Sequence, residues 1–210
     1  MECINIEFDT PAENIAFDEL LLAQAECGQR HKTLRFWEIK NYVVVLGKGR
    51  SVADDVFIDR CKKDNIKIIQ RISGGGTVLL GKGCLNYSLL LPYDSSKELL
   101  NIRSSFKFIL ERLVAGFKGL NLNIKFHPVS DLALDDKKIS GNAQARKKKF
   151  LLHHGTFLYD FDIERVNFYL KEPQKYPQYR DNRTHKDFLT NIPYSYTELK
   201  EMIKDSLASL

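Results

Sequence analysis

The sequence predicts an α+β domain with a mixed, largely antiparallel sheet flanked by helices. Segments with helical periodicity and segments with strand-like alternation are interspersed, without the regular strand and helix alternation of a parallel α/β sheet. The 210 residues, 43% of them hydrophobic, are enough for one well-packed core and few for two. We therefore expect a single domain that spans residues 1–210.

The first half of the chain begins with a helix. A capping box at residues 10–13 and a stop signal at Gly28 predict this helix over residues 11–26. Residues 34–38 and 42–46 are strand-like and only a short turn separates them, which predicts a hairpin. Next we expect a helix over 52–65 and a strand over 66–71.

The second half continues with short strands around one long helix. This helix is expected over 97–118, where apolar residues recur with helical spacing up to Gly119. A proline- and tyrosine-rich stretch, 171–191, is expected to be a long ordered loop, and a capping box at Ser195 starts a last helix. The expected strands are 77–80, 84–91, 123–126, 131–134, 138–141 and 154–161.

Composition excludes several classes of protein. No apolar run approaches the roughly 18 residues that a membrane helix needs, and the acidic N-terminus does not resemble a secretory signal, so we expect a cytoplasmic protein without membrane contact. The four cysteines are scattered, which favours reduced, mostly structural thiols. The net charge of +5 suits an anionic ligand or an acidic protein partner and does not require nucleic acid. The basic run Arg146–Lys149 is either a solvated loop or a surface for such a partner.

Three successive glycines, Gly74, Gly75 and Gly76, stand between two strand-like segments. Without a Cβ they can adopt positive φ and present bare N–H groups, which predicts either a flexible turn or a cradle for an acyl or phosphate group. A phosphate-binding P-loop fits poorly, because Gly83 stands where that motif needs a serine or threonine, and a strand rather than a helix follows.

A second polar group of residues lies downstream of the glycines. Lys138 is expected on a strand close to Gly141, where its ammonium group could face the bare backbone of the glycine run. Asp131 is near enough in sequence to hold a metal ion or to orient this lysine. The alternative interpretation is a surface lysine beside a turn.

Several ordered motifs resemble those of the biotin/lipoate protein ligase family, and among its members the lipoate ligases most of all. The resemblance covers most of the chain, with compatible spacing between the motifs. Its central motifs are Arg71–Val78, Leu85–Ser88, Asp131 together with Lys138–Gln144, and His154–Thr156. Its outlying motifs are Asn14–Glu19, Arg35–Trp37, Val43–Gly47 and Arg183–Phe188.

The resemblance implies a fold related to class II aminoacyl-tRNA synthetases and a two-step reaction. Lipoate or octanoate reacts with ATP to give an acyl-adenylate and pyrophosphate, and the acyl group then passes to a lysine of a lipoyl carrier domain. The implied carriers are those of 2-oxoacid dehydrogenases or the glycine cleavage H protein. ATP and Mg²⁺ are the implied cofactors, and lipoate is the substrate. The chemistry brings two anions together, so it needs fixed positive charge.

Residue by residue, the resemblance assigns roles within this site. Lys138 matches the catalytic lysine that grips the acyl carbonyl and phosphate oxygens, Asp131 matches the acidic residue associated with Mg²⁺, and Asn86 matches a position near the adenine or phosphate. The other residues implied in binding substrate and ATP are Arg71, Ser73, Gly74, Gly75, Gly76, Thr77, Ser140, Gly141, Ala143, His154, Gly155 and Thr156.

Two departures from the family pattern affect these expectations. Leu79, Leu80 and Gly81 stand where many members carry a histidine, so no role of that histidine is transferred. The large ligases also carry a C-terminal accessory domain, whereas this sequence ends at Leu210. We therefore expect either a separate accessory chain or the use of a preformed acyl donor.

Other functions stay open at this point. A related branch transfers octanoyl groups through a cysteine thioester, which needs a nucleophilic cysteine near the lysine motif, but no cysteine follows Cys84. Cys84 itself enters an apolar strand and is expected to be a small buried residue. We therefore favour a ligase that uses an adenylate. A biotin ligase and a non-catalytic binder of lipoyl domains are further alternatives.

Overall fold

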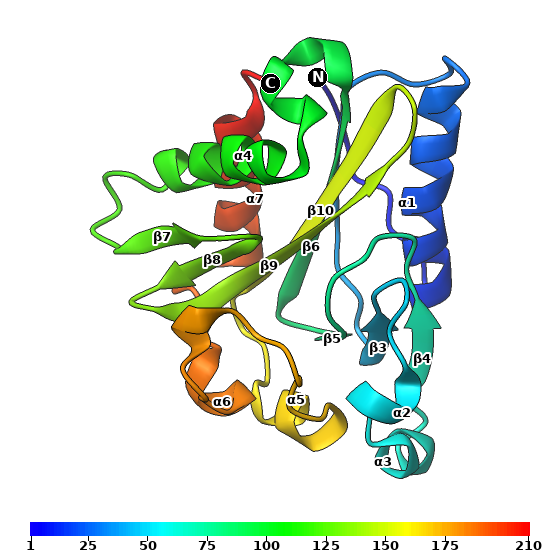
Figure 1. Ribbon diagram of the computed structural model, residues 1–210, viewed down its shortest axis with the longest axis vertical. Helices are drawn as coiled ribbons and strands as arrows, with labels where there is room; N and C mark the ends of the chain where they lie inside the picture. The colour runs from blue at the N-terminus through cyan, green and yellow to red at the C-terminus, as the bar shows by residue number, and fades with distance from the viewer.

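Two β-sheets form the centre of the molecule. The computed structural model, which describes residues 1–210, contains a seven-stranded sheet in the order β1-β2-β6-β10-β9-β8-β7 and a three-stranded sheet in the order β4-β3-β5 (Figure 1). In the large sheet only β1 and β2 pair in parallel, and in the small sheet only β3 and β4 do. The predicted mixed, largely antiparallel α+β fold is therefore confirmed. The large sheet contains β1 (Glu2–Ile4), β2 (Thr33–Trp37), β6 (Cys84–Pro92), β10 (Phe150–Leu158), β9 (Lys137–Arg146), β8 (Asp131–Leu134) and β7 (Ile124–His127). The small sheet contains β4 (Lys67–Gln70), β3 (Val43–Leu46) and β5 (Val78–Leu80).

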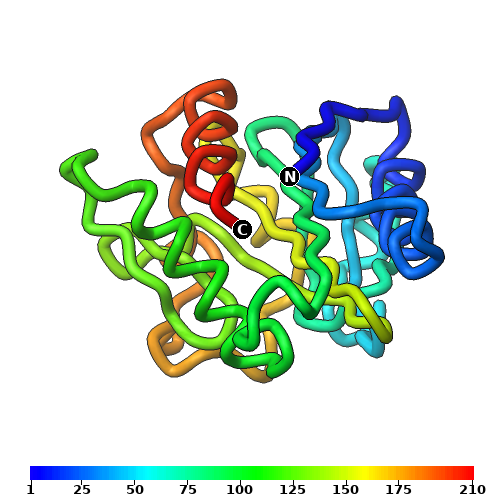
Figure 2. The backbone as a smooth tube through the Cα atoms, turned by 90° about the horizontal axis from the view of Figure 1, so that it is seen from above, coloured from blue at the N-terminus to red at the C-terminus, as the bar shows by residue number.

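Helices cover both faces of the large sheet. Figure 2 shows α1 (Pro11–Glu26) on one side and α4 (Ile102–Gly116) with α7 (Tyr196–Leu207) on the other. The capping boxes predicted the starts of α1 and α7 correctly, since the hydroxyl groups of Thr10 and Ser195 accept from the N–H groups of Glu13 and Glu198. No helix is both long enough and apolar enough to span a bilayer.

The central strand β6 faces two environments. Leu85, Tyr87 and Leu89 belong to the main core, which also contains apolar residues of α4 and α7. Leu90 packs on the opposite face with Leu22 of α1. Because side chains alternate along a strand, the polar residues Asn86 and Ser88 share the face of Leu90. The cavity described below is bordered by Asn86 and Ser88 on this second face.

The predicted hairpin between residues 34–38 and 42–46 is wrong. β2 lies between β1 and β6 in the large sheet, and β3 lies between β4 and β5 in the small sheet. Every residue of both strands is buried, so neither face of either strand is open to solvent. A short connection therefore carries the chain from one sheet to the other.

Other boundaries also differ from the predictions, including that of β10, which begins at Phe150 rather than at residue 154. The expected helix over 52–65 is two short helices, α2 (Val52–Asp55) and α3 (Ile58–Lys63), because Val56 forms a bridge with Leu170 between them. The expected helix over 97–118 is a 3₁₀ turn, η2 (Lys97–Leu100), followed by α4, whose start is capped by the Asn101 side chain. The expected strand over 138–141 extends to Arg146, since β9 pairs with both β8 and β10.

The region after β10 folds over the lower end of the sheets in Figure 1. It contains α5 (Glu164–Tyr169), a 3₁₀ turn η3 (Gln178–Arg180) and α6 (His185–Phe188). An ion pair between Arg180 and Glu172 closes the loop that η3 belongs to. This loop supplies part of the wall of the cavity described next.

Candidate active site

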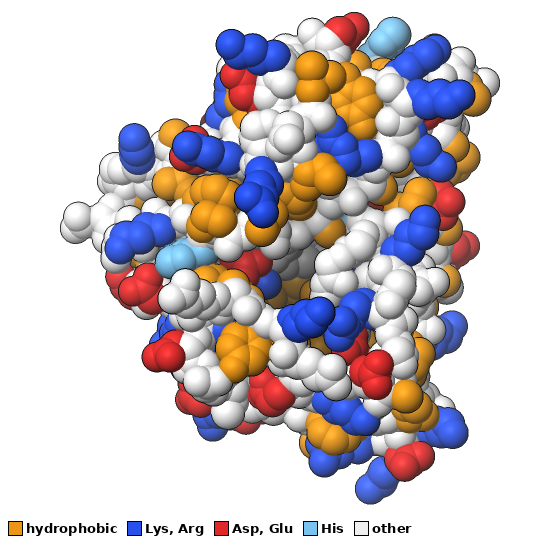
Figure 3. Space-filling model, in the orientation of Figure 1, with side chains coloured by type: hydrophobic (Ala, Val, Ile, Leu, Met, Phe, Trp, Pro, Cys, Tyr) orange, Lys and Arg blue, Asp and Glu red, His pale blue; other side chains and the backbone are white.

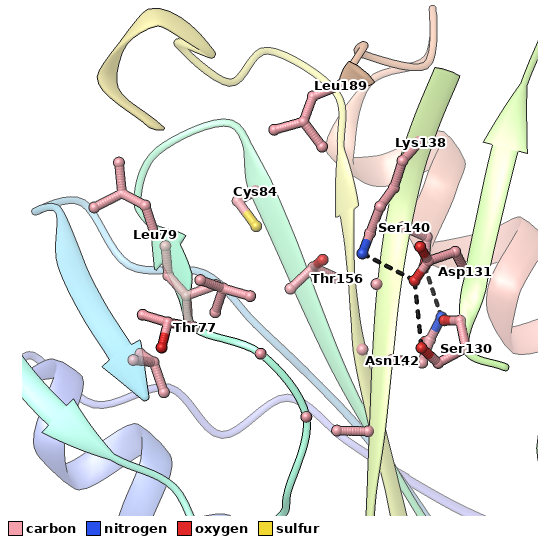
Figure 4. Close-up of a pocket in the computed structure, with 18 of the residues that line it drawn as sticks. Thr77, Leu79, Cys84, Ser130, Asp131, Lys138, Ser140, Asn142, Thr156 and Leu189 are labelled. Carbon is pink, nitrogen blue, oxygen red and sulfur yellow. Dashed lines mark hydrogen bonds and ion pairs between the residues drawn. The ribbon is translucent and has the colours of Figure 1, made fainter. Parts of the chain in front are cut away.

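One large cavity, of about 640 Å³, lies between the two sheets and the loop after α5. Figure 3 shows the hollow on one face of the molecule, with basic side chains near its rim. Figure 4 shows Thr77 and Leu79 on one wall, Lys138 and Asp131 on the opposite wall, and Cys84 with Thr156 between them. The cavity is lined by all the predicted site residues except Ser73 and Gly74.

Lys138 on β9 forms an ion pair with Asp131 on β8. The Lys138 Nζ lies 2.9 Å from Asp131 Oδ1, and 26% of the lysine side chain is exposed, so the ammonium group can be reached from the cavity. The two strands pair antiparallel, with a register shift between Leu132 and Ala133. Lys138 is therefore a partly buried residue of the cavity wall, and the alternative interpretation of a surface lysine beside a turn does not describe it.

Both carboxylate oxygens of Asp131 already have partners. Oδ1 contacts Lys138 and accepts from Ser130 Oγ at 3.3 Å, and Oδ2 accepts from the hydroxyl of Tyr179 at 2.8 Å. Burial raises the pKa of Tyr179, with the Asp131 charge as the second cause, so this phenol stays protonated and donates. The sequence analysis missed Tyr179, which lies 48 residues from Asp131 in the chain. Its ring stacks on His127 with 3.9 Å between the centroids.

The glycine run lies opposite Lys138 and is organised by Arg71. Nη2 of Arg71 donates to the carbonyl oxygens of Gly74 at 2.7 Å and Gly76 at 2.8 Å. Burial lowers the pKa of this guanidinium to about 10, which leaves it charged at neutral pH. The N–H groups of Gly74, Gly75, Gly76 and Thr77 donate to no other protein atom. Arg71 is therefore bonded to its own loop, and the loop keeps free N–H donors beside the cavity.

The remaining predicted residues come from β6, β9 and β10. Asn86 donates to the carbonyl oxygens of Trp37 and Cys84, and Ser140 Oγ accepts from Asn142 at 3.1 Å. His154 is bonded to Ser73 and to Asp18 of α1. Gly141, Ala143, Gly155 and Thr156 complete this part of the wall.

A second polar cluster lies by β5 and joins Thr77, a predicted site residue, to Arg50 and Asp55, which the sequence analysis missed. Arg50 Nε donates to Asp55 Oδ2 at 2.7 Å, and the hydroxyl of Thr77 donates to the same carboxylate. These hydrogen bonds and the Arg50 charge hold the pKa of Asp55 below its usual value, although burial acts in the opposite direction and is the largest single cause. Asp55 is therefore a permanent anion that fixes Thr77 next to the glycine run.

The scan against known protein families matches residues 10–208 to the lipoyl protein ligase A/B catalytic domain. The chain belongs to this family. Its resemblance to lipoate ligases, deduced from the motifs, is thereby confirmed.

Sequence relatives of the chain carry two kinds of name. A probable lipoate-protein ligase A of Mycoplasma pneumoniae is 31% identical over 160 residues, which cover 76% of this chain and 46% of that protein. An octanoyltransferase LipM of Clostridioides difficile is 30% identical over 177 residues, which cover 74% of this chain and 64% of that protein. The chain thus spans about half to two thirds of the length of these relatives.

Solved structures support the same fold. A bi-partite lipoate protein ligase from Thermoplasma acidophilum has a TM-score of 0.83 at 23% identity, covering 99% of this chain and 82% of that chain. A lipoate-protein ligase A bound with ATP has the same TM-score and identity, and the match covers 99% of this chain and 83% of that chain. The structure of a biotin acetyl coenzyme A carboxylase synthetase from Helicobacter pylori matches with a TM-score of 0.51 at 14% identity, covering 99% of this chain and 74% of that chain. The expected relation to biotin ligases is therefore present at the level of fold.

The cysteines of this lipoyl ligase family member are poorly placed for thiolate chemistry. Cys84 is the one cysteine that lines the cavity, and it is fully buried. Burial, followed by the charge of Glu38, raises the pKa of its thiol far above the usual value. Cys61 is buried in the second core, and Cys3 and Cys27 are exposed and do not line the cavity.

The basic run lies far from the lysine. Residues 147–149 form the turn between β9 and β10, and all three are exposed. Nine residues of extended strand separate Lys147 from Lys138, a span of about 30 Å at the usual rise per residue. A partner that docked on this turn would therefore contact the protein a long way from Lys138.

Proposed function

We propose that the protein is an ATP-dependent lipoate-protein ligase. It activates lipoate or octanoate to an acyl-adenylate and transfers the acyl group to a lysine of a lipoyl carrier domain. The observation that carries this proposal is the pairing, across one cavity, of the Lys138 ammonium with a glycine loop whose N–H groups are free. Two sets of donors that face each other suit a mixed anhydride of a carboxylate and a phosphate.

The apolar part of the cavity suits the hydrocarbon chain of the substrate. It is lined by Leu79, Leu80, Leu158, Phe161, Val166, Leu170 and Leu189. A medium-length acyl chain gains free energy by leaving water for such a surface, at about 0.8 kcal/mol per buried CH₂ group. The carboxylate end would then lie toward the polar residues of β9 and the glycine loop.

In the first step, a carboxylate oxygen of the acid attacks the α-phosphorus of ATP, and pyrophosphate leaves. Both reactants are anions, so their approach is opposed by charge repulsion. The Lys138 ammonium can leave Asp131 and bind oxygens of both groups, while the N–H groups of the glycine loop bind the opposite side. In the second step, the neutral amine of the carrier lysine attacks the acyl carbonyl, the bond to phosphate breaks and AMP leaves, and the nitrogen loses a proton to give the amide.

Mg²⁺ is implied by the use of ATP, and Asp131 is the residue that we propose to accompany it. No group of three or more His, Cys, Asp or Glu side chains is arranged to hold a metal ion. Asp131 can offer one carboxylate, which fits an ion that is carried mainly by nucleotide phosphates and water. Bound in this way, the ion would neutralise phosphate charge. In the structure, the carboxylate of Asp131 orients Lys138 and accepts from Tyr179.

The acyl acceptor that we propose is a lipoyl domain of a 2-oxoacid dehydrogenase or a glycine cleavage H protein. One solved relative is described as a bi-partite ligase together with its E2 lipoyl domain. That description supports a carrier of this kind, and it also supports a separate accessory chain as a partner of the present protein.

The second candidate is an octanoyl transferase that uses a preformed acyl donor. It is favoured by the octanoyltransferase names of several relatives. A cysteine thioester requires a thiolate, however, and Cys84 is the one thiol in the cavity and resists deprotonation.

Formation of an acyl-AMP and pyrophosphate from ATP separates the ligase from the transferase. Purified protein is incubated with ATP, Mg²⁺ and either lipoate, octanoate or biotin, and the acyl-AMP is identified by mass spectrometry. The ligase proposal expects lipoyl- or octanoyl-AMP from the wild type and from the Cys84→Ala variant. Transfer from octanoyl-acyl carrier protein without ATP, abolished by Cys84→Ala in a folded protein, would support the transferase instead.

A further inference from the structure

His154, Ser73 and Asp18 form a hydrogen-bonded chain beneath the glycine loop. Ser73 Oγ lies 2.6 Å from His154 Nε2, and His154 Nδ1 lies 3.1 Å from Asp18 Oδ2. Ser73 also accepts from Arg71 Nε at 2.9 Å. We propose that His154 is a positioning residue, which acts through Ser73 to fix the orientation of the glycine loop and its free N–H groups. The inference rests on the proposed function, because it assigns the loop to the binding of an anionic substrate.

The donors and acceptors of these hydrogen bonds fit together in one arrangement of protons. The hydroxyl of Ser73 accepts from Arg71, so its single proton is free to donate to His154 Nε2. This ring nitrogen is then the acceptor, and the ring proton is on Nδ1, where it is donated to Asp18. In this arrangement each hydrogen-bonding atom that joins Ser73, His154 and Asp18 has a partner.

Asp18 is itself held in place by buried partners. Its carboxylate accepts from Arg35 Nη1 at 2.9 Å and from Ser88 Oγ at 2.7 and 2.8 Å. The Arg35 side chain is fully buried, and its other donors bind the Asn14 side chain and the backbone oxygens of Asn14 and Ile6. The chain from Asp18 to Ser73 therefore starts from a rigid anchor formed by α1, β2 and β6.

At its other end, this series of hydrogen bonds determines which way the peptide groups of the glycine loop face. Arg71, held by Ser73, draws the carbonyl groups of Gly74 and Gly76 toward its guanidinium group. In a trans peptide the carbonyl and the following N–H point in opposite directions. The N–H groups of Gly75 and Thr77 are therefore turned away from Arg71, and both residues line the cavity.

The distances also resemble those of a catalytic Ser-His-Asp triad, and the surroundings exclude that role. Ser73 is 1% exposed and does not line the cavity, whereas Asp18, Arg71 and His154 do. A nucleophile must reach the substrate, and Ser73 is also occupied by Arg71. The serine is a link between His154 and the loop.

A double-mutant cycle tests the inference. The affinity for ATP is measured by isothermal titration calorimetry for wild type, Ser73→Ala, His154→Ala and the double variant. Each single change should weaken ATP binding about tenfold, the scale of one or two lost hydrogen bonds. Because His154 acts through Ser73, the double variant should be no weaker than the singles. His154→Gln, whose amide oxygen can accept from Ser73, should recover most of the affinity. A hundredfold, additive loss of ATP affinity in the double variant would overturn the inference. Single variants that bind ATP like the wild type would also overturn it.

Controls separate loop positioning from general damage and from failure of the proposed function. Ser105→Ala removes another buried serine hydroxyl, one bonded to Gln144 outside the cavity wall, and should leave ATP affinity unchanged. His154→Leu replaces His154→Ala in the cycle if the alanine variant does not fold. If the wild type binds no ATP, the ligase proposal fails. The cycle is then measured on acyl transfer from octanoyl-acyl carrier protein, where additive effects would still refute positioning through Ser73.

Discussion

Gly141 lies directly against the end of the Lys138 side chain. A Cβ added at position 141 would fall 2.8 Å from Lys138 Cε and 2.9 Å from Nζ, which is closer than Cβ contacts in proteins. The glycine therefore makes room for the conformer in which Lys138 pairs with Asp131 at the cavity wall.

Gly141→Ala is expected to displace the ammonium group of Lys138 and to lower kcat for adenylate formation at least tenfold. Position 141 does not have a positive φ, so alanine fits the backbone, and the free energy of unfolding should change by less than about 1 kcal/mol. Steady-state kinetics and urea denaturation check the two parts. Full activity in this variant would mean that the reacting conformer of Lys138 differs from the one described.

Lys138→Ala should slow adenylate formation by two orders of magnitude or more, since loss of preorganised charge in an active site costs roughly 3 kcal/mol. Lys137→Ala is the matched control, because Lys137 is the adjacent residue on β9 and is exposed. Pyrophosphate release measures both variants. A binder of lipoyl domains without enzymatic activity would instead show no release even in the wild type and unchanged carrier affinity in Lys138→Ala.

His153 is expected to make stability depend on pH. Burial, and secondly the neighbouring His154, lower its pKa from 6.5 to about 3. The unfolded chain therefore binds a proton below pH 6.5 that the folded chain rejects, and stability falls by about 1.4 kcal/mol per pH unit toward pH 3. Above pH 6.5 both states are neutral and this contribution is constant.

The His153→Gln variant isolates this effect, because all other titrating groups are common to both proteins. The difference in unfolding free energy between wild type and variant, from urea titrations at pH 7, 6 and 5, should shift against the wild type as the pH falls. Parallel curves would show that His153 can be protonated in the folded protein.

Charge reversal near the cavity should weaken docking of an acidic carrier domain more than charge reversal in the distant basic turn. Lys175 lines the cavity and is exposed, whereas Lys148 lies in the turn about 30 Å from Lys138 by strand length. Lys175→Glu is therefore expected to raise the KM for the carrier severalfold at low salt, and Lys148→Glu to change it less. Measurement of the KM for ATP in parallel separates carrier docking from nucleotide binding. The opposite ranking would place the carrier on the β9–β10 turn.

Local signals predicted local features well and pairing between distant segments badly. Capping residues such as Ser195 marked the helix starts because their hydrogen bonds are made within one turn. The hairpin prediction failed because β2 and β3 each pair with strands of a different sheet, and those partners come from distant parts of the chain rather than from the short connection between them.

The candidate site shows the same difference between contacts that are local in sequence and contacts between distant segments. The ion pair of Lys138 with Asp131 joins residues seven positions apart on adjacent strands, and sequence spacing indicated it. The contact of Tyr179 with Asp131, and the chain from Asp18 through His154 to Ser73, join residues 48, 136 and 81 positions apart. No periodicity or motif encodes such contacts, since tertiary folding alone brings these residues together.

The two faces of β6 carry different sets of residues. Leu85 and Leu89 pack into the main core, Asn86 and Ser88 face α1 and the cavity, and Tyr87 packs in the core while also lining the cavity. A saturation mutagenesis scan along this strand should therefore show a two-residue alternation, with loss of soluble protein at one set of positions and loss of activity at the other. Substrate preference can then change through the second set without repacking the interior, so the strand is a suitable starting point for redirecting the enzyme to other acids.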